Sequence, residues 1–134
     1  MNNKNGARWM VVDDDTDVLD TVTQLLAAVS GAEISGFASP WQALDALATE
    51  PNGFDLVITD LEMPSMNGID FRRHVQAIAP SAKILLATGS GLFTDESARE
   101  NGFCGLLNKP FSICALKRAL TNVGADLSKL SALN

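Results

Sequence analysis

The sequence has few of the features that mark secreted, membrane or nucleic-acid-binding proteins. Its only two cysteines, Cys104 and Cys114, match no CxxC or Cys/His spacing for a structural zinc site and are too few for a disulfide framework. We expect both to be buried thiols in a reducing cytoplasm. No apolar run at the start of the chain has signal-peptide length, and no later run approaches the length that spans a membrane. These absences predict a cytoplasmic protein without membrane insertion.

Basic residues are scarce as well. The chain has 10 Lys and Arg against 16 Asp and Glu, which gives a net charge of −6. Nucleic acids are bound mainly by Lys and Arg side chains that displace counterions from the phosphates. We therefore expect no direct binding of nucleic acid by this chain.

The remaining composition is that of an ordinary globular protein. With 134 residues, 46% of them hydrophobic and 19% charged, the chain suits one domain with a packed core. No internal repeat or low-complexity segment suggests a second domain.

Short apolar runs alternate with longer segments of helical period. This pattern is typical of an α/β fold in which helices cover both faces of a parallel sheet. We predict five strands, over Trp9–Val12, Glu33–Phe37, Asp55–Thr59, Lys83–Ala87 and Gly105–Leu107. We predict five helices, from about Thr16, from Pro40, over Ile69–Ala79, over Thr94–Asn101 and over Ile113–Asn122, with Gly124 ending the last helix and a helical turn or fraying over Asp126–Leu133.

Several residues are expected to begin these helices. Ser39 is placed to cap the second helix, with Pro40 at its first position and Gln42 closing a capping box. Ser112 should cap the last helix, and Asp15 is expected to be a capping or solvent-facing residue.

The chemically informative residues all follow strands. They are Asp13, Asp14 and Asp15 after the first strand, Asp60 after the third, Thr88 after the fourth and Lys109 after the fifth. In an open parallel sheet, ligands bind beyond the carboxyl ends of the strands. These side chains should therefore meet in one crevice.

Carboxylates gathered in one crevice repel each other, and a bound cation offsets that repulsion. A small set of oxygen ligands favours Mg²⁺, which keeps several waters and shares phosphate oxygens with its substrate. A lysine and a hydroxyl opposite the metal would neutralise the other phosphoryl oxygens. The residues are those that phosphoryl transfer requires.

Four motifs carry a family resemblance. They are V-V-D-D-D at Val11–Asp15, D-L-V-I-T-D-L-E-M-P-S-M-N-G at Asp55–Gly68, A-T-G at Ala87–Gly89 and N-K-P-F at Asn108–Phe111. In this order and spacing, the chain resembles a response-regulator receiver domain of two-component signalling, of the chemotaxis-regulator type. The resemblance covers about residues 9–123, so that residues 1–134 would form a single receiver domain with a short tail over 124–134.

The resemblance implies roles for individual residues. Asp60 matches the phosphorylated aspartate, Asp13 and Asp14 the acidic pair at the Mg²⁺ ion, Thr88 the switch hydroxyl and Lys109 the lysine at the phosphoryl group. It further implies that the backbone carbonyl of Glu62 binds the metal and that Lys109–Pro110 is a cis peptide.

The resemblance also implies a fold, partners and an activity. The sheet should have the flavodoxin-like strand order 2-1-3-4-5. The phosphoryl group should come from a histidine kinase or a histidine phosphotransfer protein, and a dimer surface is expected on the fourth helix, fifth strand and fifth helix. Such a domain catalyses only its own phosphorylation and dephosphorylation, so it is not an enzyme in the ordinary sense.

One position departs from the family pattern. Many relatives have an aromatic residue three positions before the lysine, where this chain has Leu106. In those relatives the aromatic ring moves inward when the threonine is drawn to the phosphoryl group. A chain with leucine at this position cannot use that movement. We expect Leu106 to stay packed and the Thr88–Leu92 loop to carry the signal.

Two other functions compete with this interpretation. An aspartate-nucleophile phosphatase of haloacid-dehalogenase type would use Asp13 or Asp14 with Mg²⁺, but the chain lacks the acidic pair that should follow the lysine. A flavodoxin-like flavin module would need Ser, Thr or Gly where Asp13–Asp15 stand. The sequence leaves open whether the domain is free-standing, a relay intermediate or part of a longer protein.

Three further side chains are assigned to structure. His74 is expected on a solvated helix face, where it would take no part in a phosphorelay. Trp9 and Trp41 are expected to be packing residues.

Overall fold

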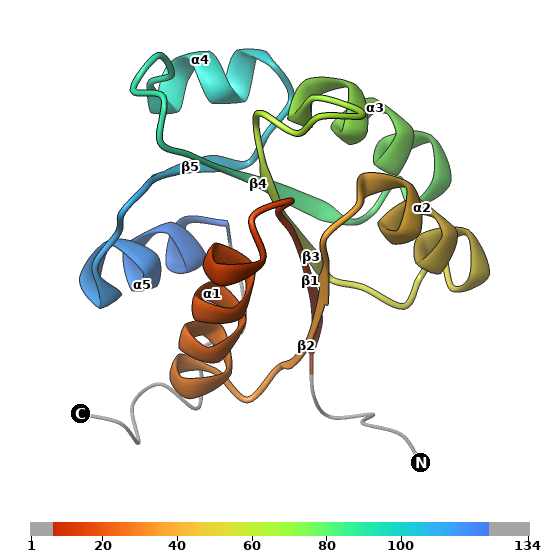
Figure 1. The fold of residues 1–134 in the computed structure, drawn as a ribbon, viewed down its shortest axis with the longest axis horizontal. Coiled ribbons are helices and arrows are strands. Elements are labelled where there is room, and N and C mark those ends of the chain that lie inside the picture. Colours follow the sequence, from red (N-terminus) through yellow and green to blue (C-terminus); the bar gives the residue numbers. More distant parts are fainter. Residues whose placement is uncertain (1–6, 124–134) are drawn as a thin grey trace.

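The computed structural model describes residues 7–123, which form five strands and five helices in alternation (Figure 1). The strands are β1 Arg8–Val12, β2 Glu33–Phe37, β3 Leu56–Asp60, β4 Lys83–Thr88 and β5 Gly105–Asn108. The helices are α1 Thr16–Val29, α2 Pro40–Thr49, α3 Gly68–Ile78, α4 Asp95–Glu100 and α5 Ile113–Asn122. Each predicted element is present, and the predicted ends differ from the observed ones by at most one residue. Gly124 and Asp126–Leu133 lie outside the described residues.

All neighbouring strands are parallel, and the sheet order is β2-β1-β3-β4-β5. The predicted fold class and strand order are therefore confirmed. Because all the strands are parallel, the loops after β1, β3, β4 and β5 leave the sheet at the same end, the carboxyl end of the strands.

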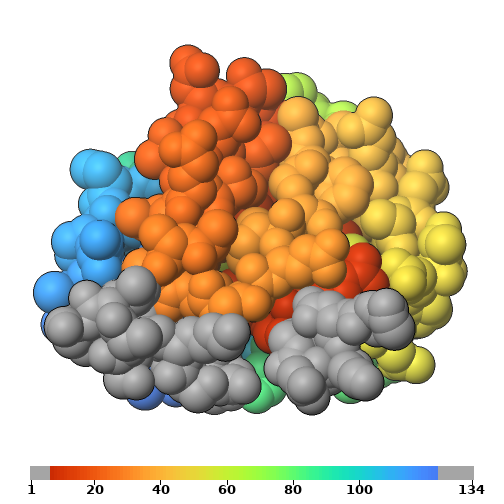
Figure 2. Space-filling view, turned by 90° about the horizontal axis from the view of Figure 1, so that it is seen from below, coloured from red at the N-terminus to blue at the C-terminus, as the bar shows by residue number. Residues whose placement is uncertain are grey.

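Helices cover both faces of this sheet (Figure 1). On one face, Trp9 and Val11 of β1 pack in a cluster that includes Leu26 of α1 and Leu120 of α5. Figure 2 shows α1 in orange beside α5 in blue on this side of the molecule. On the other face, residues of α2, α3 and α4 pack against the alternate positions of the same strands, such as Met10. The sheet is thus buried on both faces, as expected of parallel strands.

Side chains cap most helices as their residue types suggest. Asp15 accepts hydrogen bonds from the backbone N–H groups of Asp17 and Val18, and Ser112 accepts one from Ala115. The predicted capping box at Ser39 is wrong, because the Ser39 side chain makes no capping hydrogen bond. Pro40 occupies the first turn of α2, where its fixed φ suits the helix without a side-chain cap.

Three side chains are more exposed than the sequence predicted. Trp9 is buried as predicted, but Trp41 is 52% exposed and touches the ring of the exposed His74 at 6.1 Å between centroids. Cys114 is exposed and Cys104 only half-buried, although we expected buried thiols. Trp41 lies two residues before the buried Ala43 of α2, and Cys114 lies two residues before the buried Leu116 of α5. Two residues turn a helix by about 200°, so Trp41 and Cys114 lie on the side of the helix opposite to these buried residues.

None of the helices between residues 7 and 123 combines the length and the hydropathy that crossing a bilayer requires.

Candidate phosphoryl-transfer site

The loops that follow β1, β3, β4 and β5 enclose an open crevice of about 450 Å³. It is lined by Asp13, Asp14, Asp15, Val18, Asp60, Glu62, Thr88, Gly89, Ser90 and Lys109. All six site residues predicted from the sequence therefore lie in one place. They come from four different loops because the parallel strands end at one edge of the sheet.

Three carboxylates approach each other at the floor of the crevice. One oxygen from each of Asp13, Asp14 and Asp60 lies within 4.8 Å of the other two. Asp13 is only 4% exposed, whereas Asp14 is exposed and Asp60 lies between these extremes. Asp13 is held in place by the backbone, since its Oδ1 accepts a hydrogen bond from the N–H of Asp15 at 3.0 Å.

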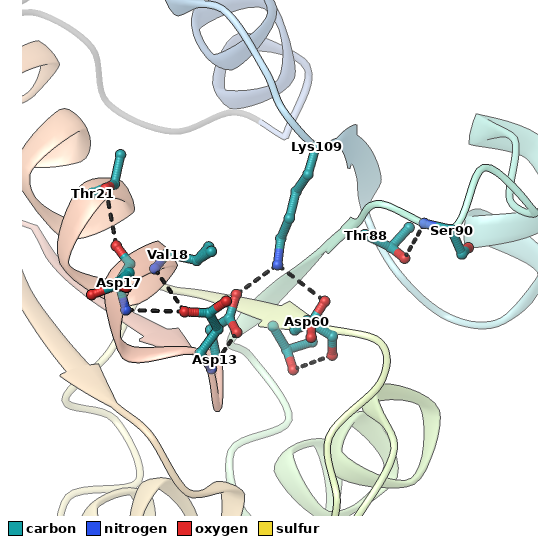
Figure 3. A network of polar contacts seen from close by, with 10 residues as sticks. Asp13, Asp17, Val18, Thr21, Asp60, Thr88, Ser90 and Lys109 are labelled. Carbon is teal, nitrogen blue, oxygen red and sulfur yellow. Dashed lines mark hydrogen bonds and ion pairs between the residues drawn. The ribbon is translucent and has the colours of Figure 1, made fainter.

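Lys109 supplies the positive charge that these carboxylates need. Its Nζ lies 2.6 Å from Oδ2 of Asp13 and 3.1 Å from Oδ1 of Asp60, so that it bridges the ends of β1 and β3 (Figure 3). The backbone N–H of Lys109 also donates to the carbonyl of Thr88 at 2.9 Å. Lys109–Pro110 is a cis peptide, as the resemblance implied.

Burial and neighbouring charges act in opposite directions on the pKa values of Asp60 and Lys109. Burial raises the pKa of Asp60, and the nearby Lys109 charge only partly opposes that rise. Burial lowers the pKa of Lys109, but its hydrogen bond to Asp13 and the charges of Asp13 and Asp60 outweigh burial, so the pKa is raised overall. Lys109 is therefore a cation at neutral pH, and the ionised form of Asp60 is less favourable in the folded protein than it would be on an exposed carboxyl.

Thr88 is buried, and its hydroxyl is already engaged. The Thr88 Oγ1 accepts a hydrogen bond from the N–H of Ser90 at 3.2 Å (Figure 3). The Ser90 Oγ accepts one from the N–H of Leu92, also at 3.2 Å. Leu92 is 79% exposed, and Gly91 has a φ of 72°. The loop after β4 is thus held by two hydroxyl-to-amide contacts, with little packing around Leu92.

Sequence reasoning missed one residue of the crevice. Ser90 lines it and donates its N–H to Thr88, yet it belongs to none of the patterns that identified the other residues. The only signal in the sequence was its place two residues after Thr88, between Gly89 and Gly91. His74 lies outside the lining of the crevice, as predicted.

The donor set suits a hard divalent cation. It consists of carboxylate oxygens, which Mg²⁺ prefers, and the oxygens from the three residues lie within 4.8 Å of one another, close enough to share one ion after small movements. The contact of Lys109 with Asp13 and Asp60 shows that the crevice already accommodates a positive charge between these groups. The residues present therefore fit a metal.

A family model described as the response regulator receiver domain matches residues 9–121. The chain belongs to this family. The match and the geometry of the crevice establish the domain as the receiver of a two-component phosphorelay, a phosphoacceptor signalling module that is not an enzyme with a separate substrate. The phosphatase and the flavin module considered above are therefore rejected.

Individual relatives agree with the family assignment. The receiver domain is 33% identical over 103 residues to the C4-dicarboxylate transport transcriptional regulatory protein DctD of Rhizobium meliloti, covering 76% of this chain and 22% of that protein. It is 30% identical over 112 residues to the two-component response regulator ARR11 of Arabidopsis thaliana, covering 84% of this chain and 21% of that protein. The chain thus spans about a fifth of the length of these relatives.

Solved structures show the same fold. A receiver domain protein from Clostridium thermocellum superimposes with a TM-score of 0.78 at 29% identity, covering 96% of this chain and 99% of that chain. The chemotaxis protein CheY4 of Vibrio cholerae superimposes with a TM-score of 0.76 at 28% identity, covering 88% of this chain and 98% of that chain.

The raised pKa of Asp60 predicts how stability depends on pH in the absence of metal. A group whose pKa is higher in the folded state than in the unfolded state stabilises the fold at low pH, and this contribution is lost as the pH rises through the folded-state pKa. Replacing Asp60 by asparagine should therefore raise the Tm at neutral pH in EDTA, because asparagine carries no charge that burial would penalise. The gain should fade as the pH falls through the raised folded-state pKa of Asp60, because the wild-type carboxyl is then protonated.

Thermal melts of both proteins across this pH range provide the measurement, with Asp45→Asn on the exposed side of α2 as the matched charge control. Equal Tm values at neutral pH, or a gain that grows in acid, would contradict the assigned direction of the pKa shift.

Proposed function

We propose that the receiver domain accepts a phosphoryl group on Asp60 beside a Mg²⁺ ion held by Asp13, Asp14, Asp60 and the backbone carbonyl of Glu62. The observation that carries the proposal is the contact of Lys109 Nζ with both Asp13 and Asp60 at the edge of a crevice that also contains Asp14 and Thr88. It brings a nucleophilic carboxylate, a metal-binding pair and a cation within reach of one phosphoryl group.

The proposed reaction transfers a phosphoryl group from a phosphohistidine of the donor to the carboxylate of Asp60. A carboxylate oxygen of Asp60 forms a bond to phosphorus while the P–N bond of a donor phosphohistidine breaks, and the electron pair of that bond returns to the imidazole, which takes up a proton from solvent. The product is an aspartyl phosphate. Catalysis in such a site consists mainly of positioning and charge neutralisation.

Lys109 and Thr88 have separate roles in this proposal. The Lys109 ammonium already touches Asp60 and would pair with an oxygen of the phosphoryl group once that group is attached. Thr88 would turn its hydroxyl from the Ser90 N–H towards another phosphoryl oxygen. When bound, Mg²⁺ neutralises further negative charge on the phosphoryl oxygens.

A histidine kinase is the partner that a receiver domain implies, and we propose a histidine kinase or a histidine phosphotransfer protein as the phosphodonor. An open apolar groove of about 460 Å³ adjoins the crevice and supports a protein donor. It runs between α1 and the loop after β5, where Val18, Leu25 and Phe111 contribute apolar surface and Lys109 lines both cavities. A helix carrying the donor histidine would bury this groove while presenting the histidine to Asp60.

We propose that residues 1–134 contain this one receiver domain, with its core over about 9–123, and that the protein acts in the cytoplasm. A dimer through α4, β5 and α5 is supported by a depression of about 620 Å³ on that surface, which Phe93, Leu106 and Arg118 help to line.

The route of the conformational signal follows from the packing of Leu106. Its side chain is half-buried against the cluster that contains Leu86 and Phe103. Moving a leucine of this kind into water would forfeit up to about 1.5 to 3 kcal/mol of burial. We propose that Leu106 keeps its position and that the weakly held Thr88–Leu92 loop moves instead.

The site of modification is tested by chemical phosphorylation. With Mg²⁺ and acetyl phosphate, the protein should gain one phosphoryl group as an acid-stable, base-labile acyl phosphate on Asp60. Asp60→Asn should remove the label, whereas the His74→Gln control should retain it because His74 lies outside the crevice. Mass spectrometry that placed the label on Asp13, Asp14 or His74 would contradict the proposal.

Metal binding is tested without any phosphodonor. A ligand bound only by the native state adds about 2.7 kcal/mol of stability at one hundred times its dissociation constant. The Tm should therefore rise across a Mg²⁺ titration at fixed ionic strength, and Asp14→Ala should reduce the rise. A wild-type Tm that does not respond to Mg²⁺ would remove the metal site from the proposal.

The signal route is tested by amide and methyl chemical shifts recorded before and after addition of beryllofluoride with Mg²⁺. Large amide changes over Thr88–Leu92 with an unchanged Leu106 rotamer are expected, because the loop is held by two hydroxyl contacts while Leu106 is packed. A rotamer change at Leu106 with an unchanged loop would overturn the proposed route.

A further inference from the structure

A buried hydroxyl lies directly before the phosphoacceptor and has no role in the reaction described so far. Thr59 is 0% exposed and pairs in register with Val12 of β1 and Leu86 of β4. Both neighbours belong to the apolar cluster under α2 and α3. A hydroxyl in such surroundings is unfavourable unless it is hydrogen-bonded. Valine has the same β-branched shape but no hydroxyl.

The hydrogen bond that Thr59 makes is directed at the acceptor residue. Its Oγ1 donates to the backbone carbonyl of Asp60 at 2.9 Å. The same carbonyl is confined by α3, because a Cβ atom added at Gly68 would lie only 2.5 Å from the Asp60 oxygen and 3.0 Å from the Cα of Leu61. The N–H of Gly68 donates in turn to the Leu61 carbonyl at 2.7 Å. Two successive peptide groups after β3 are thus held by named contacts.

These contacts have a consequence for the crevice. The peptide plane of Asp60 determines the direction of its own carboxylate and the path of the chain to Glu62, whose carbonyl is the proposed fourth metal ligand. The Asp60 and Leu61 carbonyls each accept a hydrogen bond, so the path of the chain from Asp60 to Glu62 is fixed by contacts on both peptide groups between them.

We propose that Thr59 is a positioning residue for phosphoryl transfer, and that its hydroxyl orients the Asp60 peptide so that the Asp60 carboxylate and the Glu62 carbonyl converge on the metal. The inference rests on the proposed function, in which Asp60 is the acceptor. Thr59 touches neither the phosphoryl group nor the metal, and it acts through the backbone of its neighbour.

The test separates the hydroxyl from the shape of the side chain. Thr59→Val removes the hydroxyl and keeps the branch, and Thr59→Ala compared with Thr59→Ser removes the same hydroxyl from a smaller side chain. The two pairs are wild type against Thr59→Val, and Thr59→Ser against Thr59→Ala. In each pair, the protein without the hydroxyl should show either an Mg²⁺ affinity or a rate of Asp60 labelling that is lower by about fivefold, which is the effect of one neutral hydrogen bond. The Tm of Thr59→Val in EDTA should equal or exceed that of the wild type, which a purely structural role of the hydroxyl would not produce.

Thr49→Val is the matched control, because the Thr49 hydroxyl also donates to a backbone carbonyl, that of Asp45, far from the crevice at the end of α2. It should leave Mg²⁺ binding and labelling unchanged. If Thr59→Val binds Mg²⁺ and labels as the wild type does, or if Thr59→Ser loses as much as Thr59→Ala, the hydroxyl has no positioning role. If the wild type itself is not labelled on Asp60, the proposed function fails. If the wild type and Thr59→Val are both labelled at the same rate and bind Mg²⁺ equally well, only the positioning role of Thr59 fails.

Discussion

The ammonium group of Lys109 makes this crevice possible, because it offsets the repulsion between two partly desolvated carboxylates. Asp13 and Asp60 follow adjacent strands, whereas Lys109 follows β5, which β4 separates from β3. The long lysine side chain therefore connects loops that share no backbone pairing. Without that charge, burial would raise the pKa of the acceptor further and so disfavour the ionised carboxylate that acts as nucleophile.

The two sides of the crevice differ in how firmly they are held. On the β3 side, the Asp60 and Leu61 peptides are confined by a buried hydroxyl and by the close approach of Gly68. On the β4 side, two hydroxyl-to-amide contacts hold a loop whose Leu92 is exposed. A site of this kind can keep its acceptor and metal ligands fixed while the other side responds to the added charge, and fixed ligands are what phosphoryl transfer requires.

The sequence predicted the fold well, because periodicity and chain punctuation are local properties. Alternating apolar runs located every strand and helix, and Pro and Gly near their ends limited the errors to single residues. The errors came from side-chain direction. Trp41 and Cys114 are apolar residues in amphipathic helices, and only the rotation of each helix about its axis shows that they point to solvent.

The site shows the same division. The residue types and their places after strands determined by themselves that Asp13, Asp14, Asp60, Thr88 and Lys109 would meet, because parallel strands end at one edge of a sheet. The sequence could not determine that Lys109 bridges two of the carboxylates or that burial raises the pKa of Asp60. Distances of 3 Å and the exclusion of water depend on how loops from different strands pack together, and that packing exists only in the tertiary structure.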